Sequence, residues 1–216
     1  ARARLLHIVG LLGGKWPHTL AIQPGGVTRA PSLRDKLRMQ ASLRAFRAYL
    51  EAEMFGAPLE AFMALESVAA LEAWDTGDVA LFLEIAVDLD LAAMGRGAGR
   101  YLSYGAYPTA AGPVFARGIW AEGALGVFDP ALIAEDLSHA WMLGEATHPD
   151  KGQTVPDEAM RDPGYSWCKA PRLGGLGYET GALARQVVDG HPLARALAGE
   201  GSVRARIVGR LLEIAR

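Results

Sequence analysis

Apolar residues recur every three or four positions along the first part of the chain, and this spacing predicts helices. Residues 1–12 form a first helix that ends at a glycine pair. A longer helix runs from Ser32, with Asp35 as its capping partner, to Gly56. Its inward positions are Met39, Leu43, Phe46, Leu50 and Met54. Between the two helices, residues 13–31 are rich in glycine and proline and predict an irregular loop.

Two further helices are predicted over residues 58–75 and 78–95, because Pro58 and Asp78 are residues that suit helix starts. In the second of them, the positions expected to face inward are Leu81, Phe82, Ile85, Leu89 and Ala92. The acidic residues of this helix form no pattern typical of a metal site. We therefore expect both helices to be scaffold.

From residue 100 onward the pattern changes. Residues 101–107, a turn at 108–113 and residues 114–120 predict a small antiparallel hairpin. Asp129 is expected to open another helix, whose inward positions are Leu132, Ile133, Leu137 and Trp141. Glu135 lies among these apolar neighbours, so it is either paired or partly protonated. A loop over residues 147–164 and two short helices over 183–188 and 202–216 complete the chain. The expected fold class is α+β, predominantly helical, with a small antiparallel β patch.

Composition narrows the class of protein. A chain of 216 residues and 23.0 kDa can form one domain with its own core. Its 50% hydrophobic residues and mean hydropathy of +0.11 indicate apolar surface that is buried against further segments or a partner. The net charge of −2 and the pI of 6.2 argue against a nucleic-acid binder. The sequence contains no apolar run long enough for a transmembrane segment. The single cysteine excludes an internal disulfide and leaves the compartment open.

Residues 165–185 are the part of the chain least easily explained as packing. They begin with Tyr-Ser-Trp-Cys-Lys-Ala-Pro-Arg at 165–172, pass through a glycine-rich turn, and end with Glu-Thr-Gly-Ala-Leu-Ala-Arg at 179–185. Proline fixes its own φ and disfavours a helical conformation in the residue before it. Lys169 and Arg172 are therefore expected on a stiff, extended segment.

This stretch resembles the large subunit of nickel-iron hydrogenases, in which Tyr-Ser-Trp-x-Lys-Ala-Pro-Arg is followed by a glycine loop and Glu-x-Gly-Pro/Ala-Leu-Ala-Arg. Residues 13–18 and 25–28 are similar to the family's Gly-Gly-Lys-x-Pro-His and Gly-Gly-Val-Thr. Residues 101–107 and 133–141 are similar to its connecting segments, in the same order. The resemblance covers most of the chain. It implies a hydrogenase large-subunit-like core, with residues 1–216 as a single partial domain from the interior of that subunit.

Metal ligands are what this chain lacks. The family holds nickel and iron with two Cys-x-x-Cys pairs, whereas this sequence has one cysteine, Cys168, at a variable position. Such a centre needs several soft thiolates. We therefore expect no catalytic or metal-ligating residue in this chain, and no activity from it alone. Either it is the central piece of a longer large subunit, which we favour, or it is a relative that has lost the ligands.

The resemblance implies reversible oxidation of H2 to protons and electrons at a nickel-iron centre, within an uptake or sensory hydrogenase. It also implies a small-subunit partner that carries iron-sulphur clusters, and a magnesium or water-filled site near the carboxyl end of the large subunit. The supporting residues that it suggests lie in the loop and in the later motifs: Lys15, His18, Arg29, Glu135, Lys169, Arg172 and Glu179. His18 would face the nearest iron-sulphur cluster of the small subunit, or it would only hold the loop in place by hydrogen bonds.

Two other functions stay open for this sequence. A maturation or scaffolding relative without ligands would share the motifs but would not catalyse the reaction. The basic side of the helix from Ser32 could make the chain a plain interaction module, although a solvated or interface-facing side is more common. His139 and His148 have no cysteine or histidine at ligand spacing, so we expect them to be surface or hydrogen-bonded histidines.

Overall fold

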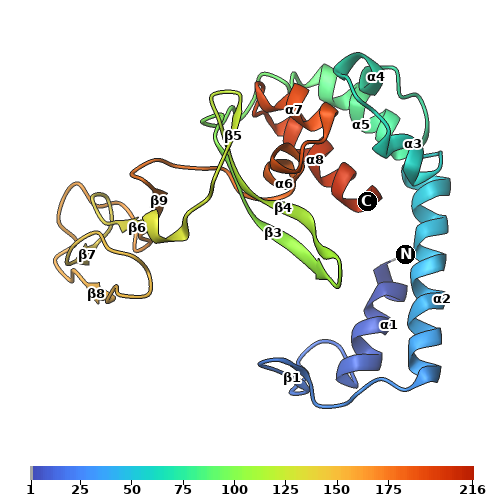
Figure 1. Cartoon of the computed structure of the whole chain (residues 1–216), viewed down its shortest axis with the longest axis horizontal. Coiled ribbons are helices and arrows are strands. Elements are labelled where there is room, and N and C mark those ends of the chain that lie inside the picture. Colours follow the sequence, from blue (N-terminus) through green and yellow to red (C-terminus); the bar gives the residue numbers. More distant parts are fainter. Residues whose placement is uncertain (1) are drawn as a thin grey trace. The chain divides into compact units, whose positions relative to one another are not determined.

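The computed structural model describes residues 2–216, so Ala1 of the first predicted helix lies outside the described residues. Its contacts divide the chain into two units. The first contains the chain up to Ala64 and Glu72–Ile85, and the second contains Leu65–Leu71 and Ala86–Arg216. The elements of both are labelled in Figure 1. The expectation of one partial domain over residues 1–216 stays a prediction.

The first unit is built mainly from helices. It contains α1 (Arg2–Gly13), a two-stranded hairpin of β1 (Ile22–Gln23) and β2 (Gly26–Val27), α2 (Leu33–Tyr49), the π-helical turn η1 (Leu50–Met54) and α3 (Leu59–Met63). An aromatic cluster forms its core. The ring of Phe62 lies 4.9 Å from that of Phe55 and 5.2 Å, edge-on, from that of Trp74. Both phenylalanines are fully buried.

Two glycines allow the ends of helices to meet beside this cluster. Gly56 and Gly77 both have positive φ, and a Cβ atom on either residue would lie 2.6 Å from the backbone nitrogen of the other. Thr76 and Trp74 then donate side-chain hydrogen bonds to the carbonyl of Phe55, at 2.9 Å and 3.1 Å. This close approach requires glycine at both positions.

The predicted capping box at the start of α2 is confirmed. The Ser32 hydroxyl accepts the backbone N–H of Asp35, and the Asp35 carboxylate accepts the backbone N–H of Ser32 at 3.1 Å. Arg29 also pairs with this carboxylate, at 2.6 Å. The Ser32 side chain is the main cause that lowers the pKa of Asp35, and its backbone N–H and Arg29 add to the effect.

We expect Asp35→Asn to destabilise the chain in a pH-dependent way. A carboxyl group with a lowered folded-state pKa contributes stability above its unfolded pKa of about 4, and that stability is lost as pH falls through the folded value. Urea unfolding of the native chain and of the variant should therefore differ most at pH 6 and converge in acid. A difference that is the same at all pH values would contradict this role of the carboxylate.

Two predictions about the next helices are wrong. The helix expected over residues 58–75 is divided into α3 and α4 (Val68–Glu72), because the Ser67 hydroxyl accepts the backbone N–H of Ala70 and starts a new helix there. In α5 (Gly77–Asp88), the buried residues are Val79, Leu83 and Ala86, while the expected inward positions Leu81 and Ile85 are exposed. Since α5 is apolar on most sides, periodicity could not identify its buried face.

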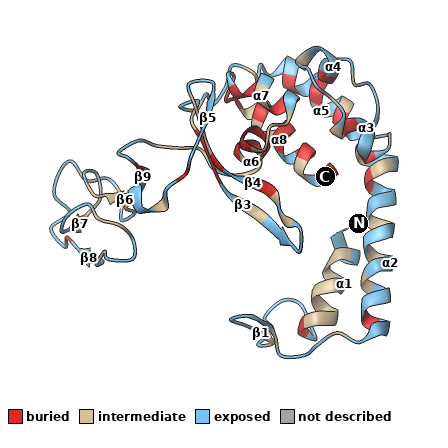
Figure 2. Ribbon diagram, in the orientation of Figure 1, coloured by how far each residue is buried: buried red, intermediate tan, exposed pale blue. Residues whose placement is uncertain are grey.

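The second unit combines a three-stranded sheet with three helices. Strands β3 (Tyr101–Thr109), β4 (Gly112–Ala121) and β5 (Ala124–Gly126) form an antiparallel sheet in the order β3-β4-β5. Helix α6 (Ala182–Asp189) packs on β3 and β4 and also on α8 (Val203–Ala215). Helix α7 (Pro192–Ala198) lies between α6 and α8 in the sequence and was not predicted. Figure 2 shows the buried residues concentrated in these helices and on the sheet. The largest fully buried aliphatic residues here are Val187, Leu193, Leu197, Val208 and Leu212.

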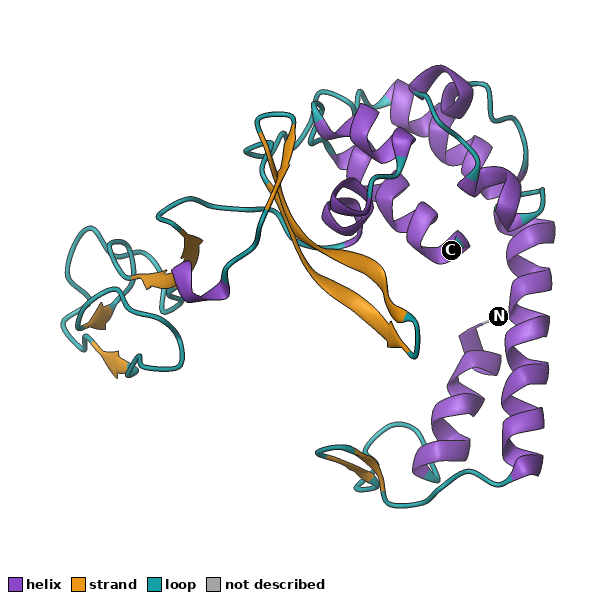
Figure 3. Ribbon diagram, in the orientation of Figure 1, coloured by secondary structure: helices purple, strands orange, loops and turns teal. Residues whose placement is uncertain are grey.

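The prediction of a helix after Asp129 is also wrong. Asp129 caps only one turn, η2 (Pro130–Leu132), and the chain then forms strand β6 (Ile133–Asp136). This strand pairs antiparallel with β9 (Ala170–Leu173), so that Glu135 lies opposite Pro171. Pairing with a distant strand outweighed the helical spacing of the apolar residues. Figure 3 shows how little regular structure separates β6 from β9 apart from β7 (Met142–Leu143) and β8 (Val155–Pro156).

The expected class, helical α+β with antiparallel strands, is confirmed by these elements. The extended conformation expected around Arg172 is confirmed by β9, which begins at Ala170, whereas Lys169 lies just before the strand. Across residues 2–216, none of the helices combines the length and the apolar content needed to cross a bilayer.

Candidate functional site

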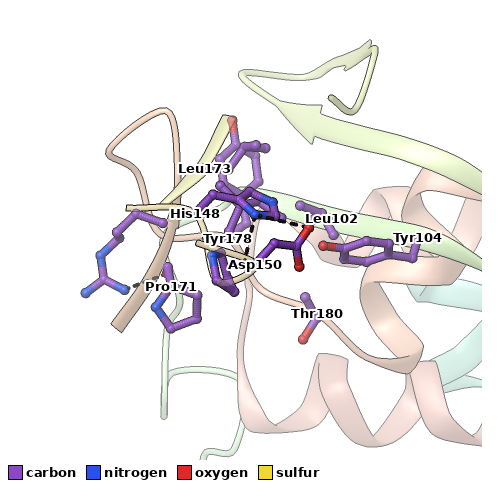
Figure 4. Close-up of a pocket in the computed structure, with 11 residues that line it drawn as sticks. Leu102, Tyr104, His148, Asp150, Pro171, Leu173, Tyr178 and Thr180 are labelled. Atoms are coloured by element: carbon purple, nitrogen blue, oxygen red, sulfur yellow. Dashed lines mark hydrogen bonds and ion pairs between the residues drawn. The ribbon is translucent and has the colours of Figure 1, made fainter. Parts of the chain in front are cut away.

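A pocket of about 420 Å³ opens in the second unit beside strands β3, β6 and β9 (Figure 4). Its volume lies within the range of small-ligand sites. The apolar part of its wall belongs to a small hydrophobic cluster in which Leu102 and Leu173 are buried and Ile133 and Tyr178 pack against them. The polar part of the lining is contributed mainly by His148, Asp150, Arg172 and Thr180. The pocket thus combines an apolar surface with several hydrogen-bonding groups.

His148 and Asp150 form the polar side of the pocket (Figure 4). The backbone N–H of Asp150 donates to Nδ1 of His148 at 3.2 Å, and the carboxylate oxygen lies 3.5 Å from the same nitrogen. Because Nδ1 accepts a hydrogen bond, the neutral imidazole carries its proton on Nε2. His148 is therefore the hydrogen-bonded histidine that was expected, but its place in a pocket wall was missed. In the sequence, the only nearby feature that could have indicated this pocket position is the short polar turn around Pro149.

Glu135 and Lys169 form an ion pair across the β6–β9 sheet. The Lys169 ammonium lies 3.1 Å from Oε2 of Glu135 and donates a second hydrogen bond, at 2.9 Å, to the carbonyl of Gln153. The side chain of Lys169 is 13% exposed and that of Glu135 is 26% exposed. Glu135 is therefore paired, which was one of the two alternatives expected, although it lies on a strand. The ionic partner satisfies a carboxylate that is largely removed from water.

Arg172 extends the same polar region to the pocket. Its guanidinium donates to the carbonyl of Pro171 at 2.9 Å, and its side chain lines the pocket wall. Arg172 also lies near Asp136, whose pKa is lowered mainly by the backbone N–H of Ser138 and to a smaller extent by this guanidinium. The structure thus places Glu135 on β6, Arg172 on the paired strand β9, and Lys169, the ionic partner of Glu135, just before β9.

Glu179 does not line the pocket, although its neighbours Tyr178 and Thr180 do. Its carboxylate forms two hydrogen bonds with Arg206 of α8, from Nε at 2.7 Å and from Nη2 at 2.9 Å. These bonds are the main cause that raises the pKa of Arg206. The sequence suggested Glu179 but gave no indication of its partner.

The other three predicted residues belong to the first unit. Lys15 and His18 are exposed, and His18 adopts a positive φ of 59° within the loop before β1. Arg29 is mostly exposed and pairs with Asp35 at the start of α2. The loop therefore presents Lys15 and His18 to solvent.

The side chains present do not fit a thiolate-held metal centre. Cys168 is exposed, and its backbone N–H donates to the Ser166 hydroxyl at 3.0 Å. Within residues 2–216, no group of three or more histidine, cysteine, aspartate or glutamate side chains is arranged to hold a metal ion. Glu135 does not fit a magnesium site by itself, since its carboxylate already faces an ammonium group and Mg²⁺ takes about six oxygen ligands.

Comparison with known proteins gives one consistent family. A family model described as nickel-dependent hydrogenase matches residues 1–196. The Hydrogenase-2 large chain of Escherichia coli K12 is 30% identical over 197 residues, which are 84% of this chain and 32% of that protein. The chain thus spans about a third of the length of the curated relatives that it matches. The motif-based resemblance is confirmed.

Solved structures share the fold. The Ni-Fe-Se hydrogenase of Desulfovibrio vulgaris Hildenborough superposes with a TM-score of 0.69 at 23% identity, over 99% of this chain and 46% of that chain. The enzyme of Desulfomicrobium baculatum gives a TM-score of 0.67 at 19% identity, over 100% of this chain and 47% of that chain. At these identities the likeness establishes the fold alone. It confirms the predicted large-subunit-like fold.

Proposed function

Because this chain belongs to the nickel-dependent hydrogenase family, we propose that it forms part of the large subunit of an enzyme that oxidises H2 reversibly to protons and electrons. The observation that supports this most strongly is the match over residues 1–196, which includes both sequence motifs. The alanine, proline and arginine of the Lys-Ala-Pro-Arg motif lie in strand β9, and its lysine, just before the strand, pairs with Glu135. In this proposal, the enzyme is a hydrogenase of the uptake or sensory type.

The nickel-iron centre is held by residues outside this sequence. One cysteine cannot supply the several thiolates that such a centre needs. The contribution of these residues is the polar and apolar surroundings of the centre. The chain by itself is inactive in this proposal.

Glu135, Lys169 and Arg172 act as a supporting polar network. A paired carboxylate and ammonium on a two-stranded sheet keep a fixed orientation, which is the requirement for groups that orient a neighbouring site. Their place is beside a magnesium ion or a water-filled site, with the cation's own ligands coming from elsewhere in the subunit. Arg172 is the member of this network that lines the pocket.

The partner in this proposal is a small subunit that carries iron-sulphur clusters. The loop before β1, with Lys15 and His18 exposed, contacts that subunit near its closest cluster, and Arg29 holds the end of the loop to α2 through Asp35. Electrons leave the large subunit through those clusters.

One second candidate is supported by the single cysteine: a ligand-less scaffold or maturation relative with the same fold. H2-dependent reduction of a redox dye distinguishes the two functions. The native polypeptide that contains these residues is isolated through an affinity tag and assayed under H2, with the same sample under argon as the control. We expect dye reduction under H2 only. A preparation that retains nickel but reduces no dye would contradict the hydrogenase function.

A further inference from the structure

The segment Tyr178–Thr180 forms the wall of the pocket next to Leu102 (Figure 4). Tyr178 and Thr180 line the pocket, while the carboxylate of the intervening Glu179 is bonded to Arg206. Successive side chains of an extended segment point to opposite sides. Glu179 therefore points away from the pocket, and a contact at its side chain can fix the position of this wall.

All three guanidinium nitrogens of Arg206 donate hydrogen bonds. Besides the two bonds to Glu179, at 2.7 Å and 2.9 Å, its Nη1 donates to the carbonyl of Gly95 at 2.6 Å. The side chains of Arg206 and Glu179 are 29% and 18% exposed. A paired arginine and carboxylate with two parallel hydrogen bonds fix both position and orientation, which a single point contact would not.

The backbone of Glu179 connects this ion pair to the pocket. Its N–H donates to the carbonyl of Arg100 at 2.8 Å, and its carbonyl accepts the N–H of Leu102 at 2.9 Å. Between them, the buried Tyr101 donates its hydroxyl to the carbonyl of Ala198 at 2.7 Å. Burial raises the pKa of Tyr101 to about 12, so this hydroxyl keeps its proton at neutral pH. A displacement of Glu179 would therefore displace Leu102, Tyr178 and Thr180 together.

Gly97 shows how closely the chain packs around the ion pair. A Cβ atom at this position would lie 2.8 Å from Oε2 of Glu179 and 2.9 Å from Nη2 of Arg206. Its backbone N–H donates to the carbonyl of Gly201, just before α8. The ion pair is thus enclosed by the segment that precedes β3 and by the start of α8.

We propose that Arg206 is a positioning residue, which through Glu179 fixes the pocket wall formed by Leu102, Tyr178 and Thr180. Arg206 lies beyond residues 1–196, the part of the chain that the family model matches. The functional importance of this wall rests on the proposed function, whereas the positioning itself does not.

Amide hydrogen exchange tests the positioning directly. In Arg206→Gln, we expect the amides of Leu102 and Glu179 to exchange about tenfold faster, since residues joined in one hydrogen-bonded network are coupled. The amide of Val187, inside α6, should keep its rate. Arg206→Lys should restore part of the protection because it keeps the charge. Arg210→Gln is the matched control, because Arg210 lies on the same helix and is exposed.

Equal acceleration at Val187 would overturn the proposal, since it would mean that Arg206 only stabilises the unit as a whole. Unchanged exchange at Leu102 and Glu179 would also overturn it. The same variants are then assayed for H2 oxidation in the native polypeptide, with nickel content measured. A lower kcat at unchanged nickel content in Arg206→Gln supports a functional role for the wall. Altered local exchange with unchanged kcat would support the positioning and contradict a functional role for the wall.

Discussion

Replacing Gly209 with alanine is expected to lower the free energy of unfolding by about 3 kcal/mol, the upper end of the cost of overpacking. Gly209 lies in α8 where this helix meets the start of α6. A Cβ atom there would lie 2.7 Å from Cα and 2.8 Å from the backbone nitrogen of Leu183. Because these are backbone atoms, the contact cannot be relieved by a rotamer change. The two helices would have to separate.

Gly10→Ala is the matched control for this prediction. Gly10 also lies inside a helix, α1, and a Cβ atom there would meet nothing within 4 Å. Alanine is a better helix former than glycine, so this variant should gain about 0.5–1 kcal/mol. Urea unfolding of both variants measures the two effects. A loss of stability in Gly10→Ala as large as that in Gly209→Ala would mean that the close helix contact is not the cause.

Replacing Lys169 with methionine is expected to cost about 2–3 kcal/mol, somewhat less than the loss of one partner from a fully buried ion pair. The variant leaves Glu135 without its ammonium partner and the carbonyl of Gln153 without a donor. Glu135 is still 26% exposed, so water can solvate part of its charge. The strand pair β6–β9 should loosen, and H2 oxidation by the native polypeptide should fall.

Two variants make the Lys169 prediction specific. Lys151→Met removes an exposed lysine from the neighbouring loop and should change stability little. Adding Glu135→Gln to Lys169→Met removes the unpaired charge and should recover part of the lost stability. Unfolding in urea measures these variants together with the single Glu135→Gln variant. If the double variant were as unstable as the sum of the two single variants, the residues would act independently and the pairing would carry no energy.

Local chemistry was predictable from the sequence where neighbours in the chain decide it. The capping box at Ser32 and Asp35 needs only residues three positions apart, and it formed as expected. The hairpin of β3 and β4 was predicted from two stretches that favour strands and the turn between them. The motif at residues 165–172 identified the family because it consists of several fixed residue types in one short stretch.

Other features were not predictable because they depend on partners far along the chain. Glu135 has apolar neighbours at helical spacing, but it lies on strand β6 and pairs with Lys169, which is 34 residues later in the chain. Nothing near Arg206 or Arg216 in the sequence indicates a partner, yet Arg206 pairs with Glu179 and Arg216 with Asp189, each 27 residues away. His148 had no spacing signal, since its pocket is assembled from β3, β9 and the loop that carries it.

The most direct test of the central claim is the intact mass of the native polypeptide that carries these residues, with nickel and iron quantified in the same sample. If the chain is part of a working large subunit whose metal ligands lie elsewhere, the mass will be far above 23.0 kDa and nickel will be present. A native polypeptide of 23.0 kDa without nickel would contradict the hydrogenase function and would support the ligand-less scaffold instead.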